Sequence, residues 1–219
     1  MARYLFPRWS NKVVPTAIAL AVLLGTSASA ALWYYGTNKH LEVGFMPTQP
    51  VDYSHKLHAG DLGMDCRYCH ATVERSAKAS VPPTQTCMNC HAKVRTDSAK
   101  LLPVRESYAD DKPIPWVRIH NLPDYVYFDH SAHLAAGVGC ETYHGRMDRM
   151  PKVEQVQPLS MGWCLDCHRN PAPNLRDPKD VTKMGLQPAT ASIATGEGGV
   201  AIVNGRALHP PTNCSGCHR

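Results

Sequence analysis

The sequence is poor in the residues that fill an ordinary protein core. It has 3 phenylalanines against 18 prolines in 219 residues, and aromatic residues make up 7% of the chain. Proline lacks a backbone N–H donor and interrupts helices and central strands, so long regular elements are disfavoured wherever it is frequent. The length allows one medium domain or two small ones. We therefore expect something other than side chains to fill much of the interior.

Several functional signatures are also missing. There is no long basic stripe with interleaved aromatic residues, and the net charge is only +5, which argues against a nucleic-acid partner. We find no carboxylate pair, no nucleophile beside a base and no phosphate-binding loop, so no catalytic site of the chain's own is predicted. No cysteine is left for an ordinary disulfide, because all 9 lie in short motif windows.

Four of these windows fit the pattern C-x-x-C-H, and a fifth nearly does. The complete windows are CRYCH from Cys66, CMNCH from Cys87, CLDCH from Cys164 and CSGCH from Cys214. The pattern is the attachment site of c-type haem, in which both thiolates add across the haem vinyl groups and the histidine binds the iron. A zinc ribbon also pairs C-x-x-C motifs, but it does not require a histidine after each. The predicted haem-binding residues are Cys66, Cys69, Cys87, Cys90, Cys164, Cys167, Cys214 and Cys217, with His70, His91, His168 and His218 as axial ligands.

The near-miss window, CETYH from Cys140, belongs to an internal repeat. The segment DYSHKLHAGDLGMDCRYCH from Asp52 matches YFDHSAHLAAGVGCETYHG from Tyr127, and each is followed by a second window. In this register Tyr143 stands where Cys69 stands, and His144 where His70 stands. We therefore predict two duplicated dihaem modules, about 51–95 and 118–170, plus a C-terminal motif. The fifth haem is expected to attach through Cys140 alone with His144 as ligand; a vacant remnant or an error in the reported residue are the alternatives.

Paired histidines precede each module and are the expected distal ligands. Residues three apart on a helix face one side but cannot bind the same face of one haem, so each pair should serve two haems. The pairs are His55 with His58 and His130 with His133, and His120 is the favoured fifth distal ligand. His209 is the alternative, and Met161 or Met64 would raise the potential of a haem relative to histidine. With histidine at both axial positions of every iron, no position is open to a substrate. Electron transfer is therefore expected rather than substrate reduction.

An apolar run spans residues 13–35, and three cations, Arg3, Arg8 and Lys12, precede it. Its length suits a transmembrane helix, and the preceding cations place the N-terminal residues 1–12 in the cytoplasm. A cleaved signal peptide is the alternative, because SASA at 27–30 has the small residues of a cleavage site. Residues 36–50 are expected to be a linker with His40 near the membrane interface, and 51–219 an extracytoplasmic, periplasmic-side pentahaem domain.

The chain resembles a known family in the paired histidines, in CRYCH and CMNCH, in WVRIHNLPDYVYFDHSAHLAAGVGCETYHGRMDRMPKVEQVQPLSMGWCLDCHR and in the closing CSGCHR. It is similar to the membrane-anchored pentahaem cytochrome c subunit of alternative complex III and to the wider class III multihaem cytochromes. The resemblance implies mostly irregular backbone with short α-helices around five haems, plus one N-terminal transmembrane helix. It also implies as partners an integral quinol-binding subunit, an iron-sulfur subunit and a second c-type cytochrome or other electron acceptor.

The function expected from this resemblance is an electron-transfer subunit of a membrane quinol:electron-acceptor oxidoreductase. The alternative is a stand-alone, membrane-anchored multihaem quinol dehydrogenase feeding a periplasmic reductase. About 20 residues separate Tyr35 from His55, so no haem motif adjoins the predicted membrane helix, which favours the first function. A terminal haem reductase would need an open iron. Separately, GGVAIVNGRAL from Gly198 predicts a small hairpin around Asn204 and Gly205.

Overall fold

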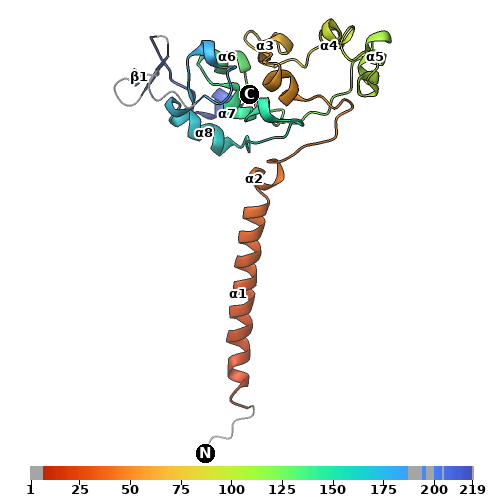
Figure 1. Cartoon of the computed structure of the whole chain (residues 1–219). Coiled ribbons are helices and arrows are strands. Elements are labelled where there is room, and N and C mark those ends of the chain that lie inside the picture. Colours follow the sequence, from red (N-terminus) through yellow and green to blue (C-terminus); the bar gives the residue numbers. More distant parts are fainter. Residues whose placement is uncertain (1–6, 187–193, 196–199, 204, 219) are drawn as a thin grey trace, which may run out of the picture. The chain divides into compact units, whose positions relative to one another are not determined.

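The computed structural model describes residues 7–186, 194–195, 200–203 and 205–218 (Figure 1). Arg3, Gly198, Asn204 and Arg219, which enter the predictions above, lie outside these ranges. The chain divides into two compact units, one ending at Glu42 and one beginning at Val43. The units are described separately below.

The first unit is dominated by helix α1, Ser10–Tyr35. Its 26 residues rise about 39 Å, which exceeds the roughly 30 Å of a bilayer's hydrocarbon core. Thr16 and Thr26 donate their hydroxyls to carbonyls one turn earlier, at 2.6 and 2.9 Å, so neither hydroxyl needs water. The helix ends at Gly36, and no residue of α1 is buried within the unit. A helix long and apolar enough to cross a membrane is therefore present, and it begins before the predicted position 13.

A short helix, α2 (Asn38–Leu41), completes this unit. The ring of His40 packs 4.4 Å from that of Tyr34 and 5.5 Å from that of Tyr35. His40 therefore belongs to an aromatic cluster at the end of α1, apart from the haem windows in sequence.

The second unit consists of short helical segments joined by irregular backbone, as predicted. All five windows lie on helices: α3 (Cys66–Cys69), α4 (Thr84–His91), α7 (Cys140–His144), α8 (Met161–Arg169) and α9 (Cys214–Cys217). The H-x-x-H pairs lie at π-helix η1 (Lys56–Asp61), which His55 immediately precedes, and on α6 (His130–Ala135). The remaining segments are η2 (Ala99–Leu101), α5 (Leu102–Ala109), η3 (Met147–Arg149), η4 (Ala172–Asn174) and η5 (Pro178–Asp180).

Three very short strands form the antiparallel sheet of the described residues, in the order β1 (Ala194–Thr195), β2 (Ala201–Val203) and β3 (Arg206–Ala207). Ile202 faces Ala207 and Val203 faces Arg206 in the register of β2 and β3. This pairing is the hairpin predicted around Asn204 and Gly205. Ala201 and Val203 are buried, so β2 contributes to the core while β3 is exposed.

The apolar core is small and divided. Ten hydrophobic side chains of the described residues are buried, and they form three separate clusters instead of one. The clusters are Val51, Val104 and Ile114; Val73, Leu134 and Val181; and Val138, Leu175, Ala201 and Val203. Such clusters bury too little apolar area to hold a domain of this size by themselves, which agrees with the expectation that a cofactor fills the interior.

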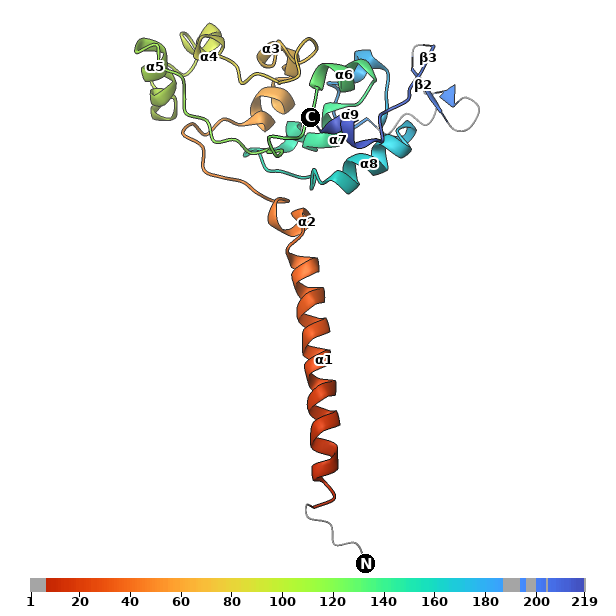
Figure 2. The ribbon, with the colours of Figure 1, turned by 180° about the vertical axis from the view of Figure 1, so that it is seen from behind.

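Two views show how the modules are arranged. Helices α3, α4 and α5 lie in one half of the second unit, and α6, α7, α8 and the sheet lie in the other (Figures 1 and 2). The halves meet where η1 packs on η3: the Lys56 N–H donates to the Met150 carbonyl at 2.9 Å. Glycine permits this approach, because a Cβ at Gly60 would overlap the carbonyl oxygen of Asp148.

Candidate functional site

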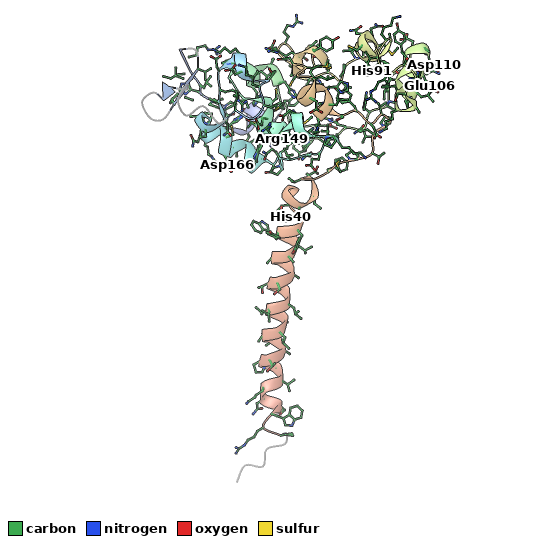
Figure 3. All side chains as sticks on the ribbon, viewed as in Figure 1. His40, His91, Glu106, Asp110, Arg149 and Asp166 are labelled. Carbon is green, nitrogen blue, oxygen red and sulfur yellow. The ribbon has the colours of Figure 1, made fainter. Side chains whose placement is uncertain are left out.

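The predicted axial histidines share one environment. All ten are half-buried, whereas His40 and His209 are exposed, and Met161 is 68% exposed. Half-burial suits a ligand that must reach a large, partly covered cofactor. His209 and Met161 are thus more exposed than the ten histidines that the sequence predicts as ligands. The windows are spread through both halves: His91 lies in the half with α5, and Asp166 of α8 lies in the other (Figure 3).

Most of these rings are fixed through Nδ1. Because a carbonyl oxygen can only accept a hydrogen bond, Nδ1 must carry the proton, which leaves the Nε2 lone pair for a metal. This arrangement orients each imidazole with its Nε2 atom free to bind iron. The contacts are His58 to Ser54 (2.9 Å), His70 to Ser80 (2.8 Å), His91 to Val94 (3.1 Å), His130 to Ala77 (2.8 Å), His133 to Asp129 (2.7 Å), His168 to Pro211 (2.7 Å) and His218 to Tyr125 (3.3 Å).

Two pairs of rings stand at the spacing of ligands that share one iron. Two imidazoles bound to one metal at about 2 Å each have ring centres roughly 6 Å apart. The ring centres of His58 and His91 are 6.2 Å apart, and those of His133 and His168 are 6.1 Å apart. In both modules the second histidine of the H-x-x-H pair therefore faces the second window, so the donor set fits bis-histidine haem there.

The two modules also repeat the packing around their paired histidines. Tyr53 lies edge-on to His55 at 4.8 Å and stacks on His58 at 4.5 Å. Phe128 lies edge-on to His130 at 4.8 Å and stacks on His133 at 4.2 Å. The sequence marked this aromatic only as part of the repeat; the structure shows that it fixes both ring planes.

Burial keeps several of these histidines neutral. Burial, followed by repulsion from His70 and His58, lowers the pKa of His55 to about 4. Burial, followed by repulsion from a group of histidines headed by His120, lowers the pKa of His144 to about 3. Burial is also the main cause that lowers the pKa of His120 and of His133. Neutral imidazoles keep the lone pair that iron requires, so desolvation favours ligation at neutral pH.

The third window differs from the others. His144 has no carbonyl partner for Nδ1; instead this atom lies 3.4 Å from Nε2 of His120, and the ring centres are 4.5 Å apart. That spacing is too short for a shared iron, so these two rings do not match a filled bis-histidine site as they stand. His130 also lies within electrostatic range of His144. It occupies the place of His55 in the repeat. His120 and His130 are thus near the third window, and His70 and His55 of the first module also lie within range of His144.

The leading cysteines of the first and third windows are in contact. The Cys140 thiol donates a hydrogen bond to the Cys66 sulfur, which raises the pKa of Cys140 and lowers that of Cys66. This contact places the leading cysteines of α3 and α7 beside each other across the two modules. Because each cysteine is a predicted attachment point, haems bound at the first and third windows would adjoin.

Other contacts join the windows in a single series. Tyr68 and Asn89 join the first and second windows by a 3.4 Å hydrogen bond. The rings of Tyr143 and Trp163, 4.9 Å apart, join the third to the fourth. His168 donates to the carbonyl of Pro211, three residues before the fifth window. The described contacts therefore place the windows in the order 87–91, 66–70, 140–144, 164–168 and 214–218.

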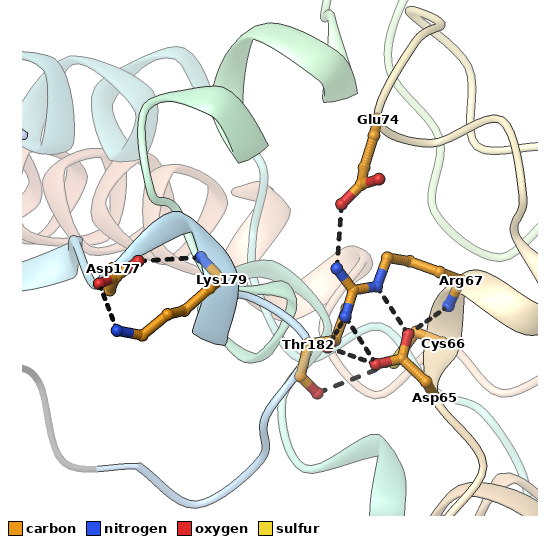
Figure 4. Close-up of polar contacts among 7 residues, drawn as sticks. All are labelled: Asp65, Cys66, Arg67, Glu74, Asp177, Lys179 and Thr182. Carbon is orange, nitrogen blue, oxygen red and sulfur yellow. Dashed lines mark hydrogen bonds and ion pairs between the residues drawn. The ribbon is translucent and has the colours of Figure 1, made fainter. Parts of the chain in front are cut away.

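An acidic residue anchors the first window. Asp65 caps α3 by accepting from the Arg67 N–H at 2.8 Å, and it also accepts from the Arg67 guanidinium and from the Thr182 hydroxyl at 2.9 Å (Figure 4). Hydrogen bonds from Arg67, more than those from Thr182, lower the pKa of Asp65 to about 2. The network ties the first window to the segment that follows the fourth.

The fourth window borders a cavity. Trp163, Cys167 and Asn174 line it together with Thr142 from the third window, and Asn174 donates to the Cys167 sulfur at 3.7 Å. The cavity thus opens beside a predicted attachment cysteine, where a haem would need room.

Comparisons with known proteins agree with this geometry. Residues 51–106 match the family described as cytochrome c7 and related cytochrome c. This part of the chain is therefore similar to cytochrome c7 and related cytochromes c. Over 102 residues the chain is 35% identical to the "Menaquinone reductase, multiheme cytochrome c subunit" of Nitratidesulfovibrio vulgaris. The match covers 46% of this chain and 48% of that protein, so the chain spans about half the length of the curated relative it matches.

The similarity to multihaem cytochromes c agrees with the four complete windows, whose pattern is typical of covalently bound haem c. The match at 51–106 contains the first two of them and the first H-x-x-H pair. The second module is related to this segment by the internal repeat and by the equivalent packing around Tyr53 and Phe128.

Proposed function

We propose that this chain is the electron-transfer subunit of a quinone-linked membrane oxidoreductase and holds five haems. The observation that carries the proposal is the repeated ligand geometry, with His58 facing His91 and His133 facing His168 at the spacing of a shared iron. When bound, haem supplies an iron that takes up and releases one electron. The relative named as a menaquinone reductase subunit supports the link to quinone.

In this proposal the protein's own groups hold and tune the cofactors. The cysteines of the windows attach them, with Cys140 providing one thioether at the third site. The proximal ligands are His70, His91, His144, His168 and His218, and the distal ligands come from His55, His58, His130, His133 and His120. Carbonyl partners at Nδ1 raise ligand basicity and fix the rings, which are recognised means of tuning a metal.

The membrane arrangement follows from α1. We propose that α1 anchors the chain, with Arg8 and Lys12 on the cytoplasmic side and the haem domain on the periplasmic side. Tyr34, Tyr35 and His40 then lie at the far interface, where aromatic rings are favoured. The partners proposed are an integral quinone-binding subunit, an iron-sulfur subunit and another c-type cytochrome or acceptor, as in alternative complex III.

The haem count is the first test. Intact mass together with a pyridine haemochrome spectrum should give five haems per chain, with one slightly shifted alpha band from the single-thioether site. Tyr143→Cys should keep the same haem number and gain a second thioether at the third window. Four haems in the wild type, or one whole haem gained by Tyr143→Cys, would show that the third window is vacant.

Quinol oxidation tests the proposed place in a complex. In membranes that contain the partner subunits, a menaquinol analogue should reduce the haems of this chain, whereas the isolated chain should not be reduced at a comparable rate. Rapid reduction of the isolated chain would instead support the stand-alone quinol dehydrogenase. A high-spin ferric signal in the oxidised chain would indicate an open iron and contradict the ligand assignments.

A further inference from the structure

Tyr53 makes two kinds of contact in the first module. Its ring packs against both histidines of the pair, and its hydroxyl shares a hydrogen bond with Cys69 of the first window. The same hydroxyl also lies within electrostatic range of Cys87 of the second window. The ring of Tyr53 thus orients both imidazoles, and its hydroxyl lies near the second window of the same module.

In the second module these contacts are divided between two residues. Phe128 keeps the packing against both histidines but has no hydroxyl. A hydroxyl is supplied instead by Tyr143, which stands in the position of Cys69. Its ring packs 4.9 Å from that of Trp163, which directly precedes Cys164, so the phenol is placed near the second window of its module.

The ring of Tyr143 also contacts the histidine of the neighbouring site. Its centre is 5.2 Å from that of Phe128, 4.9 Å from that of Trp163 and 5.9 Å from that of His133, which it meets edge-on at 82°. The three rings therefore form one cluster, in which His133 stacks on Phe128 and meets Tyr143 edge-to-face. Because position 143 lies on α7 and His133 faces α8, the third window supports a ligand of the fourth.

Steric fit accounts for the presence of Phe128 and Tyr143 where the first module has Tyr53 and Cys69. In the first module the Tyr53 hydroxyl reaches the residue at the second cysteine position. A tyrosine at 128 would direct its hydroxyl at the equivalent place, which the ring of Tyr143 fills. The absence of that hydroxyl in Phe128 makes room for Tyr143, and neither change packs well without the other.

We propose that Tyr143 is a positioning residue for the haem site of the fourth window, and that Phe128 and Tyr143 together replace the pair Tyr53 and Cys69. Tyr143 fixes the plane of His133 and keeps a phenol beside Cys164 and Cys167. Tyr143 in place of cysteine removes one thioether from the third site, and it positions a ligand of the fourth site. This inference rests on the proposed function only in that the fourth window binds haem.

A swap experiment tests the proposal on the full-length holoprotein. The variants are Phe128→Tyr, Tyr143→Cys and the double variant, which recreates the arrangement of the first module. Each is examined by intact mass, by electron paramagnetic resonance and by potentiometric titration. Signals of the fourth-window haem are identified by their loss in a Cys164→Ser, Cys167→Ser variant. Tyr143→Phe distinguishes the role of the hydroxyl from that of the ring, and Tyr108→Phe, at an exposed position of α5, is the matched control.

Each single swap should change the low-spin signal of the fourth-window haem and shift its potential, because the plane and water exposure of His133 change. The double variant should return both properties toward the wild type. Tyr143→Phe should shift the potential while keeping the signal shape, and Tyr108→Phe should change neither.

Two results would overturn the proposal: effects of the single swaps that simply add in the double variant, or a fourth-window haem that Tyr143→Cys leaves unchanged. If the proposed function itself is wrong, the intact mass of the wild type will lack the haems expected at the windows. The two kinds of failure are therefore distinguishable. The restoration by the double variant is a property that general destabilisation cannot produce.

Discussion

Asp65 shows how one side chain holds a haem window in place. Its carboxylate is shared by the end of α3, by Arg67 and by Thr182, which lies 117 residues further along the chain. The folded protein lowers its pKa from 3.8 to about 2, so the ionised form stabilises the fold. A lowered carboxyl pKa gives stability that is fully present above pH 4 and is lost as the pH falls toward 2.

Replacing Asp65 with asparagine should therefore destabilise the holoprotein at pH 7. The side chain is 43% exposed, so solvent screening limits the loss of its charged contact with Arg67 to about 1 kcal/mol, while asparagine still caps the helix. Thermal unfolding at pH 7 and pH 3 measures it: the difference between wild type and variant should shrink at the lower pH. Asp61→Asn, in an exposed ion pair with Lys56, is the control and should change stability by less than about 0.5 kcal/mol. Equal losses at both pH values would contradict this account.

At the scale of single residues, the sequence indicated the candidate side chains but not the groups that hold them in place. The pattern C-x-x-C-H and the H-x-x-H pairs identified the candidate cysteines and histidines. The carbonyl partners of Nδ1 could not be predicted, because any residue supplies a carbonyl and no side-chain pattern marks Ser80 or Pro211. The contact of His144 with His120 was missed for a related reason: spacing along the chain does not reveal how close two rings stand.

Among the elements, the packing of η1 on η3 is the clearest test of how the modules fit. Gly60→Ala would put a methyl group into the carbonyl of Asp148, so we expect a loss of about 1–3 kcal/mol from overpacking. Gly162→Ala on α8 is the matched control: its added Cβ meets nothing within 4 Å, and alanine favours a helix by roughly 0.5–1 kcal/mol. Thermal unfolding of both variants, with haem content checked by mass, should separate them. Similar stability in the two would rule out the close approach.

Element type was predictable where local chemistry decides it. The apolar run predicted α1, and its start at Ser10 was missed because polar residues extend the helix without changing the hydropathy pattern. Short helices at the windows follow from the geometry of C-x-x-C-H. The π-helical turn at η1 was not foreseen, since nothing in KLHAGD distinguishes it from an ordinary helix.

For the whole molecule, the order of the windows leads to a prediction about reduction potentials. A charge at one iron affects a neighbour more than a distant site, because electrostatic interaction falls with distance. Removing the fifth haem by Cys214→Ser with Cys217→Ser should shift the potential of one remaining haem. Removing the fourth by Cys164→Ser with Cys167→Ser should shift two.

Potentiometric titration with spectral assignment of each haem checks this. The haem of the second window, at the far end of the series, serves as the internal control and should be unaffected by either change. A large shift there on loss of the fifth haem would mean that the windows are not in this order. The series itself could not be predicted from the sequence, because it depends on contacts between modules, such as that of Cys66 with Cys140.

The hydrogen bonds at Nδ1 have a consequence for how the chain folds. Cysteines and proximal histidine are neighbours in sequence, so a haem can be attached to a stretch of five residues while the rest of the chain is disordered. The carbonyls are remote: the partner of His168 lies 43 residues away, that of His130 53 and that of His218 93. Contacts of such high contact order form late. Attachment can thus come before folding, while the final orientation of these rings waits until remote segments of the chain pack together.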